Sequence, residues 1–314
     1  MKNVTFYKFE VNSDNDLRLD QLIAMQLPEY SRSRIKNWID NNNITINGKT
    51  CSPKDKIYSK SSVEVKIFEN EELDIKAENI PLNILYEDED IIVIDKESGM
   101  VTHTAPGNYS GTLQNALLFL FPCLNNVPRA GIIHRLDKYT SGVIVIAKNL
   151  KSHNFMTKQI QSRKVKKIYH ALVCGIFEKN LTINQKIGRH KVNRKKMTVI
   201  DSGREAVSKI KVITKYKKTS FLEVDLLTGR THQIRVHLSH LGFPVIGDKT
   251  YGFKMSYLSS YKNLSNYLQT YDGHTLHAKN IEFTHPANNK IFGIESVLPK
   301  SFTDIKSYLS EQNA

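Results

Sequence analysis

The sequence predicts an α+β protein in which a small N-terminal domain precedes a larger domain with a mixed, largely antiparallel β-sheet. From Ile84 onward, the segments expected to form strands outnumber those expected to form helices. Few of the expected strands are separated by a helix that would serve as a crossover. A doubly wound parallel sheet needs such crossovers, so the pattern argues against it. The acidic, nearly aromatic-free stretch Glu69–Glu78 separates these runs from a shorter N-terminal set.

The N-terminal set predicts two short helices and a small sheet. Apolar residues within 17–27 and again within 31–39 recur at helical spacing. Residues 44–49 predict two short strands joined by the turn pair Asn47-Gly48, and the alternating run 63–67 predicts a further strand. Such a module has the size of a small domain.

The expected organisation is a domain over residues 1–70, a linker over 71–82 and a second domain over 83–314. The alternative is that the acidic stretch is a surface loop of one continuous domain. The elements expected in the second domain are the strands Ile91–Ile94, Val143–Ala147, Tyr169–Val173, Val207–Ile213, Phe221–Leu227 and Ile281–Phe283, and the helices Leu113–Leu120, Ser152–Ser162 and His232–Leu241.

Charge is the most informative bulk property. The chain has a formal net charge of +14, and Lys148–Lys218 holds 20 Lys or Arg against 3 Asp or Glu. Such segregation favours a face that binds a polyanion, although a well-solvated lysine-rich surface would give the same composition. RNA, DNA and an anionic membrane surface all remain open on charge alone.

The cysteines and the N-terminus indicate the compartment. Cys51, Cys123 and Cys174 lie far apart, which gives neither a zinc spacing nor an even disulfide set. The N-terminus lacks an apolar signal core, and no stretch approaches the roughly 20 apolar residues that cross a bilayer. We expect a soluble, cytoplasmic protein.

Three polar clusters are candidates for the functional site. Gly131–Gly142 contains His-Arg-Leu-Asp and precedes an apolar strand, Leu227–His240 combines arginines and histidines, and Lys164–Gly175 places Tyr169 at a strand. Loops beside buried strands commonly carry functional residues. Taken alone, an Arg–Asp pair is more often structural, and Tyr169 would be a core residue.

Metal binding is the obvious alternative for the second cluster, because His232, His237 and His240 are potential ligands. Histidines five residues apart diverge on a helix, and no cysteine or carboxylate completes a ligand set. We therefore expect no metal and interpret these histidines as structural or RNA-contacting.

Residues 17–67 resemble an S4 RNA-binding domain. The matching segments are Leu17–Asp20, Ser31–Arg34 and Ile44–Lys49, with Asn42 where a glycine is usual. Asparagine tolerates a left-handed backbone, so the turn is expected to survive. The resemblance implies RNA contacts by the basic residues Arg18, Arg32, Arg34 and Lys36.

Residues 84–302 resemble the RluA/RluD family of pseudouridine synthases. Besides the three clusters, the resemblance rests on Ile187–His190, Arg194–Met197, Gly203–Ala206, Val245–Gly252, His274–Ala278 and His285-Pro286. Two departures are Glu97 and Thr104, which stand where the family usually has proline. The implied activity is isomerisation of uridine to pseudouridine in structured RNA, most of all large-subunit ribosomal RNA, without a cofactor and by a monomer.

The resemblance also implies roles for individual residues. Asp137 would be the catalytic carboxylate, Arg235 its ion-pair partner, and Tyr169 the ring that packs against uracil and assists proton removal at C5. Arg135 would enter the gap left by the extruded base, and His134 and Arg230 would contact RNA. Asp137 would either attack C1′ or remove a 2′ proton, and the sequence leaves both routes open.

Two other functions fit part of the sequence. A non-catalytic RNA-binding or ribosome-assembly protein on the same fold would explain the charge, but Asp137, Tyr169 and Arg235 are all retained. An RNA glycosidase using the same carboxylate would release free uracil. Transfer RNA is the alternative substrate, and nothing resembles the recognition helix of a DNA-binding protein.

Overall fold

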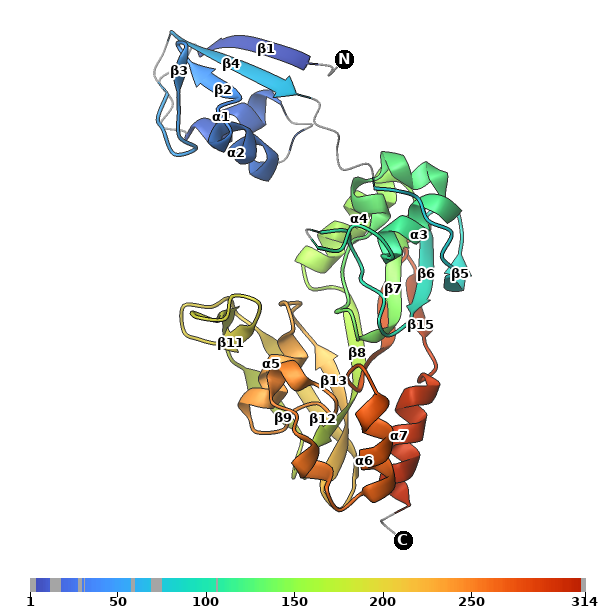
Figure 1. Ribbon diagram of the computed structural model, residues 1–314. Helices are drawn as coiled ribbons and strands as arrows, with labels where there is room; N and C mark the ends of the chain where they lie inside the picture. The colour runs from blue at the N-terminus through green and yellow to red at the C-terminus, as the bar shows by residue number, and fades with distance from the viewer. Residues whose placement is uncertain are drawn as a thin grey trace. The chain divides into compact units, whose positions relative to one another are not determined.

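The computed structural model divides the chain into two compact units, Met1–Asp74 and Ile75–Ala314 (Figure 1). The structure describes residues 4–11, 18–27, 30, 32–57, 60–68, 75–105 and 107–311, without the side chains of Val4, Ser33, Arg34, Ile67 and Phe68. Within these residues no helix is both long and apolar enough to cross a membrane.

The first unit is a four-stranded sheet with two helices. Its sheet has the order β1-β4-β2-β3. Apolar residues from both helices and the sheet, including Leu19, Ile35, Trp38 and Val63, form its core. The elements are β1 Val4–Val11, α1 Leu19–Gln26, α2 Arg32–Asp40, β2 Ile44–Ile46, β3 Lys49–Thr50 and β4 Ser61–Phe68.

Two turns of this unit were predicted correctly. Asn47 and Gly48 have φ of 50° and 76°, as expected for the tight turn that joins β2 to β3. Asn42 has φ of 59°, so it adopts the left-handed conformation expected of the residue that replaces glycine before the first strand of the hairpin. The additional strand β1, which pairs with β4, was not predicted.

The predicted linker 71–82 falls partly outside the described residues. From Ile75 onward its residues belong to the second unit, where Ile75 and Leu82 pack on the core. The Glu78 amide donates to the Asn115 carbonyl over 3.1 Å, and the Glu78 carboxylate accepts from the Gly111 amide over 3.0 Å. The predicted end of the linker at residue 82 therefore lies inside a segment that is fastened to the second unit.

The second unit is built on a nine-stranded mixed sheet. Its strand order is β5-β6-β7-β14-β8-β13-β12-β9, with β15 paired to β14, and β14–β7 is the parallel pair. The strands are β5 Asn83–Glu87, β6 Ile91–Lys96, β7 Ser141–Ala147, β8 Lys166–Cys174, β9 Leu181–Asn184, β12 Val207–Lys215, β13 Thr219–Leu226, β14 Leu276–Thr284 and β15 Ile291–Glu295, and a separate hairpin contains β10 Ile187–Arg189 and β11 Met197–Val199.

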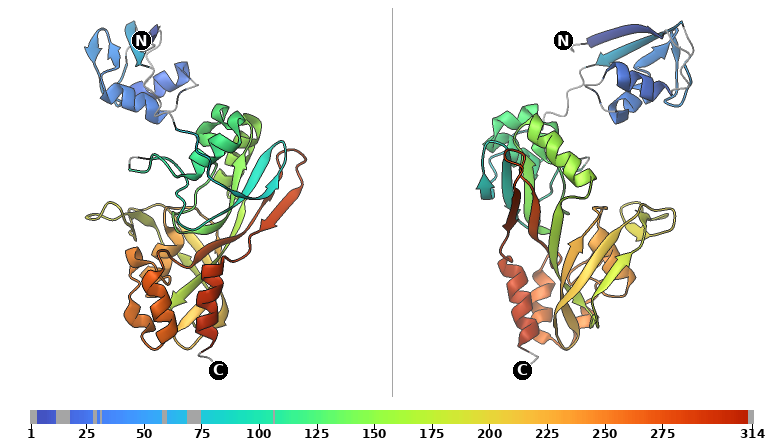
Figure 2. Two further views of the ribbon diagram at one scale, coloured as in Figure 1. Left: turned by 45° about the vertical axis from the view of Figure 1, so that its right-hand side comes forward. Right: turned by 180° about the vertical axis from the view of Figure 1, so that it is seen from behind.

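Helices cover both faces of this sheet (Figure 2). On β7, Ile144 and Ile146 face the core that includes α3 and α5, whereas Val143 and Val145 face α4. A strand buried on both faces reads as a continuous apolar run, as β7 does. The helices are α3 Leu113–Leu120, α4 Leu150–Gln161, α5 Gln233–His240, α6 Lys262–Thr270 and α7 Lys300–Ser310.

Helices α6 and α7 were not predicted. They lie side by side in Figure 1 and cover the sheet near β8 and β13. Leu264 and Leu268 of α6, with Ile305 and Leu309 of α7, pack against Leu172 and other sheet residues. Their apolar residues occur at helical spacing, but polar residues dominate both segments and obscure the pattern.

Gly142 joins β7 to β14 at the parallel pairing, and we predict that Gly142→Ala destabilises the second unit. Gly142 has φ of +104°, and an added Cβ would lie 2.2 Å from the Ala278 carbonyl oxygen. The strained backbone and the overlap with the Ala278 carbonyl together predict that the free energy of unfolding falls by about 2–5 kcal/mol. Urea denaturation followed by far-UV circular dichroism measures this loss of stability. Fluorescence of Trp38, the only tryptophan of the sequence, reports on the first unit and is the control.

Gly99→Ala is the matched variant. Gly99 has φ of +96°, but an added Cβ there meets nothing within 4 Å. The free energy of unfolding of Gly99→Ala should therefore fall only by the cost of backbone strain, about 1–2 kcal/mol. Equal losses in the two variants would show that the approach to Ala278 contributes nothing.

Candidate active site

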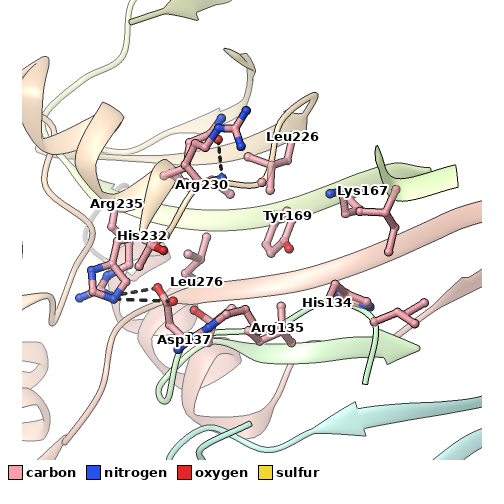
Figure 3. Close-up of a pocket in the computed structure, with 18 of the residues that line it drawn as sticks. His134, Arg135, Asp137, Lys167, Tyr169, Leu226, Arg230, His232, Arg235 and Leu276 are labelled. Carbon is pink, nitrogen blue, oxygen red and sulfur yellow. Dashed lines mark hydrogen bonds and ion pairs between the residues drawn. The ribbon is translucent and has the colours of Figure 1, made fainter. Parts of the chain in front are cut away.

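All three polar clusters of the sequence meet at one pocket of the second unit, with a volume of about 290 Å³ (Figure 3). The loop before β7 contributes Asp137, strand β8 contributes Tyr169, and α5 contributes Arg235. Other residues that line the pocket include His103, Arg129, His134, Arg135, Thr140, Lys167, Leu226, Arg230, His232 and Leu276.

The loop that carries Asp137 is fixed through its backbone. The Thr102 hydroxyl donates to the Leu136 carbonyl over 2.8 Å, and the Gly99 amide donates to the Lys138 carbonyl over 2.9 Å. The Thr140 amide closes the turn on the Asp137 carbonyl over 3.0 Å. Contacts on either side of the aspartate leave its side chain as the group that faces the pocket.

Lys96 also holds this loop in place, through hydrogen bonds of its side chain. Its side chain is 1% exposed, and its ammonium donates to the carbonyls of Glu97, Met100 and Lys138 over 2.7, 2.9 and 3.2 Å. Burial lowers the pKa of Lys96 to about 7, while Asp137 and two further carboxylates oppose the shift. An ammonium has three donor hydrogens, so three carbonyls satisfy it fully.

Arg235 bridges two carboxylates. Its Nη1 donates to Asp137 Oδ2 over 3.0 Å, and its Nε and Nη2 donate to the two oxygens of Asp248 over 2.7 and 2.9 Å. The bidentate pair fixes the plane of the guanidinium, because both of its hydrogen bonds run parallel. The third donor then has a fixed direction, toward Asp137.

Asp248 is itself held by the short turn that follows it. Its Oδ1 accepts from the amides of Thr250 and Tyr251 over 3.1 and 3.2 Å. The Tyr251 ring lies under the guanidinium of Arg235, 4.9 Å from it, which adds a cation–π contact. Asp248 and Tyr251 therefore orient Arg235 and do not face the pocket.

His232 is the second polar neighbour of Asp137. It has φ of 57° and lies before the first residue of α5, and its Nδ1 shares a 2.7 Å hydrogen bond with the Tyr251 hydroxyl. This bond directs Nε2 toward Asp137 Oδ1, 3.8 Å away. Burial lowers the pKa of His232, so Arg235 is the cation that Asp137 has beside it at neutral pH.

Asp137 stays ionised despite its burial. Burial alone would raise the pKa of its carboxyl group, but the charges of His232, when protonated, and of Arg235, together with the Arg235 hydrogen bond, hold the pKa below its usual value. Burial also acts on Arg235, whose pKa is nevertheless raised because Asp248 and Asp137 stabilise the cation.

Tyr169 forms the wall opposite this ion pair. Figure 3 shows its ring projecting from β8 between Lys167 and the Asp137–Arg235 pair. The ring is 7% exposed and belongs to the core that contains Leu226 and Leu276. Burial, with the nearby charge of Asp137, raises the pKa of the Tyr169 hydroxyl, so the neutral phenol faces the pocket at physiological pH.

The other three residues expected at this site differ in their surroundings. Arg135 is exposed and, among the described residues, no hydrogen bond or ion pair holds its guanidinium. Arg230 donates from Nε to the Glu205 carbonyl over 2.9 Å. His134 accepts from the Val145 amide at Nε2 over 3.0 Å, which gives its ring a structural role; its RNA contact stays a prediction.

Two of the basic residues expected to contact RNA in the first unit pair with a buried aspartate. Arg18 and Arg32 pair with Asp20 over 3.1 and 2.9 Å, yet both side chains remain partly exposed. Lys36 is exposed on α2, and the side chain of Arg34 lies outside the described residues. The two arginines therefore stabilise this unit, and their contacts to RNA stay predictions.

The histidines of the second cluster point in different directions. His237 is buried, with Nδ1 bonded to the Ser208 hydroxyl over 3.0 Å and Nε2 to the Gln185 carbonyl over 2.9 Å. His232 faces Asp137, and His240 is exposed. Across the described part of the chain, no group of three or more His, Cys, Asp or Glu is arranged to hold a metal ion.

Three residues that shape the site were not singled out from the sequence: Lys96, Asp248 and Tyr251. A lysine at the end of the apolar run Ile91–Lys96 is a sign of a buried, bonded ammonium. Asp248 follows a glycine and lies 13 residues after Arg235, so no local pattern links the two.

His134, a partly buried histidine of the pocket, predicts a pH-dependent stability. Burial lowers the pKa of His134 to about 3, from 6.5. Below pH 6.5 the unfolded chain takes up a proton at His134 and the folded protein does not. The contribution of this residue to the free energy of unfolding is therefore complete above pH 6.5 and is lost as the pH falls toward 3. The expected slope is about 1.4 kcal/mol per pH unit for this residue.

His134→Gln retains an acceptor for the Val145 amide. Between pH 6 and 4 it should reduce the slope of the free energy of unfolding against pH by about 1.4 kcal/mol per pH unit. His240→Gln, at an exposed position, is the control. Urea denaturation at several pH values gives both slopes. An unchanged slope for His134→Gln would mean that His134 takes up its proton in the folded protein.

Comparison with known proteins agrees with this geometry. A family model described as RNA pseudouridylate synthase matches residues 90–240, and a model described as S4 domain matches residues 17–58. The solved structure of human RNA pseudouridylate synthase domain containing 1 superposes with a TM-score of 0.56 at 26% identity, over 72% of this chain and 87% of that one.

Curated relatives extend the similarity to nearly the whole chain. The ribosomal large subunit pseudouridine synthase D of Pseudomonas aeruginosa is 43% identical over 296 residues, which cover 94% of this chain and 92% of the relative. An uncharacterized RNA pseudouridine synthase of Aquifex aeolicus is 41% identical over 320 residues, which cover 100% of both chains. This chain therefore belongs to the RNA pseudouridine synthase family of isomerases and carries an S4 domain in its N-terminal part.

Proposed function

We propose that this protein isomerises uridine to pseudouridine in large-subunit ribosomal RNA, with Asp137 as the catalytic carboxylate. The observation that carries the proposal is a buried carboxylate kept ionised by Arg235, opposite the ring of Tyr169. The name of the Pseudomonas aeruginosa relative supports ribosomal RNA as the substrate, with transfer RNA as the alternative.

The size of the pocket supports extrusion of the target uridine. A volume of about 290 Å³ is at the small end of ligand pockets and suits one nucleoside better than a stacked helix. The uridine must then leave its stack, at a cost of a few kcal/mol. Arg135 is exposed without a partner among the described residues, so its planar guanidinium is available to stack in the vacated place.

In the pocket, the Asp137 carboxylate would break the glycosidic bond by attacking C1′ or by removing a 2′ proton. The detached uracil rotates and C5 bonds to C1′, as the ester bond between Asp137 and C1′ breaks on the first route or the 2′ proton returns to C2′ on the second. C5 then loses its proton and N1 gains one, so the product has the same atoms as the substrate. The raised pKa of Tyr169 favours packing against the base over proton removal, because a neutral phenol is a poor base. Neither route requires a cofactor.

Binding of the RNA would extend beyond the pocket. The basic span Lys148–Lys218 and the S4 domain, with Arg18, Arg32, Arg34 and Lys36, supply contacts that position a polynucleotide through its phosphates. His134 and Arg230 would contact the RNA at the pocket. We propose that the protein acts as a monomer in the cytoplasm, where ribosomes assemble.

Asp137→Asn should abolish isomerisation and leave RNA binding intact. The substitution removes the charge that both routes need, so we expect at least a thousandfold loss of rate, on the order of other losses of an essential catalytic group. The affinity for RNA should change by less than about threefold, because one buried charge makes no phosphate contact. Pseudouridine is mapped by chemical adduct formation and primer extension on transcribed large-subunit ribosomal RNA.

Asp201→Asn is the matched control, since Asp201 is exposed and outside the pocket. Wild-type activity of Asp137→Asn would remove Asp137 from the chemistry. A wild-type protein that binds the RNA but forms no pseudouridine would favour the non-catalytic RNA-binding function. Release of free uracil would identify a glycosidase instead.

A further inference from the structure

Lys167 is a charged residue of the pocket wall that the proposed chemistry does not use. It lies on β8, two residues before Tyr169, so the two side chains point to the same face of the sheet. Figure 3 shows Lys167 on the side of Tyr169 away from Asp137 and Arg235. The ammonium is therefore at the end of the pocket that is remote from the ionised carboxylate.

This ammonium has no protein partner among the described residues. The lysine is half-buried, and burial lowers its pKa, while the charge of Asp225 on β13 opposes the shift without forming an ion pair. Lys96, the other lysine of this region, is satisfied by three carbonyls. A partly desolvated cation without such bonds is costly to the fold, so a ligand is the expected partner.

A second hollow of about 330 Å³ begins at Lys167 and continues away from the active site. It shares Ile160, Lys167, Gly229 and Arg230 with the catalytic pocket, and its further lining includes Arg163 and Thr228. We call this hollow the flanking groove. Its lining carries three cations and no carboxylate.

Glu205 holds the two arginines of the flanking groove in place. Arg163 donates to the Glu205 carboxylate over 2.6 Å, and Arg230 donates to the Glu205 carbonyl over 2.9 Å. Glu205 thereby offsets one positive charge but does not line the groove itself. Lys167 remains the cation without a protein acceptor at the junction.

We propose that the flanking groove binds the RNA backbone next to the extruded uridine, and that Lys167 donates to a phosphate oxygen at the junction. The proposal rests on the proposed function, which puts the uridine in the adjoining pocket. Phosphate oxygens are the usual acceptors for lysine and arginine in RNA contacts, and charge-assisted bonds of this kind are strong. A uracil carbonyl is the competing acceptor, but it would not explain the two oriented arginines beyond it.

The test compares Lys167→Met with Lys262→Met in the full-length protein. Lys262 on α6 is exposed and lies outside both hollows and outside the basic span Lys148–Lys218, so it is a lysine that the proposed RNA contacts do not use. Binding to a single-stranded ten-nucleotide oligouridylate is measured over a range of salt concentrations. Turnover on transcribed large-subunit ribosomal RNA and the melting temperature are measured for the same three proteins.

We expect Lys167→Met to weaken binding about tenfold at low salt, as for one charge-assisted hydrogen bond. The slope of log affinity against log salt should fall by about 0.7, the value for one phosphate contact on a single strand. Its melting temperature should not fall, because methionine fills the same space without an unpaired charge. Lys262→Met should leave all three quantities near those of the wild type.

Three results would overturn the proposal. An unchanged salt slope with slower turnover would assign Lys167 to the uracil instead. Equal effects of both variants would indicate diffuse attraction, and a lower melting temperature for Lys167→Met would indicate a structural role. Because the slope is measured without turnover, a wild type that forms no pseudouridine would contradict the proposed function while leaving the groove assignment standing.

Discussion

The contact between Arg235 and its two carboxylates is the interaction on which the site depends. Asp248 takes two donors of the guanidinium in a bidentate pair, so the remaining donor is directed at Asp137. Without this cation, burial would favour the protonated form of Asp137, which the proposed chemistry does not use. The cost of placing three charges in a largely buried position is offset only because each is bonded, and removal of one would leave the others uncompensated.

The mixed sheet brings these groups together from distant parts of the chain. Asp137 precedes β7, Tyr169 lies on β8, and β14 lies between those two strands. The side chains of Lys96 and Thr102 donate to backbone carbonyls of the Asp137 loop and fix it. Preorganisation of this kind lets an enzyme spend little reorganisation energy at the moment of reaction. The loop is therefore a rigid part of the site.

The buried elements were the ones that the sequence predicted best. Helix α3 has the predicted bounds Leu113–Leu120, and β7 differs by two residues at one end. Strand β15 was missed because it is short and alternates between exposed and partly buried residues. Asp137 and Arg235 are 98 residues apart, so no local pattern could pair them, and the family resemblance supplied that expectation. Asp248 was missed because a single aspartate carries no such signal.

The central claim is that Arg235 keeps Asp137 ionised, and a direct titration of Asp137 tests it. Carbon-13 NMR of protein labelled in its aspartate carboxylates, with Asp137→Asn to assign the resonance, gives the pKa in the wild type and in Arg235→Met. We expect a pKa below 3.8 in the wild type and above 3.8 in Arg235→Met, since burial then acts without the charge and the hydrogen bond of Arg235. The same pKa in both proteins would contradict the account.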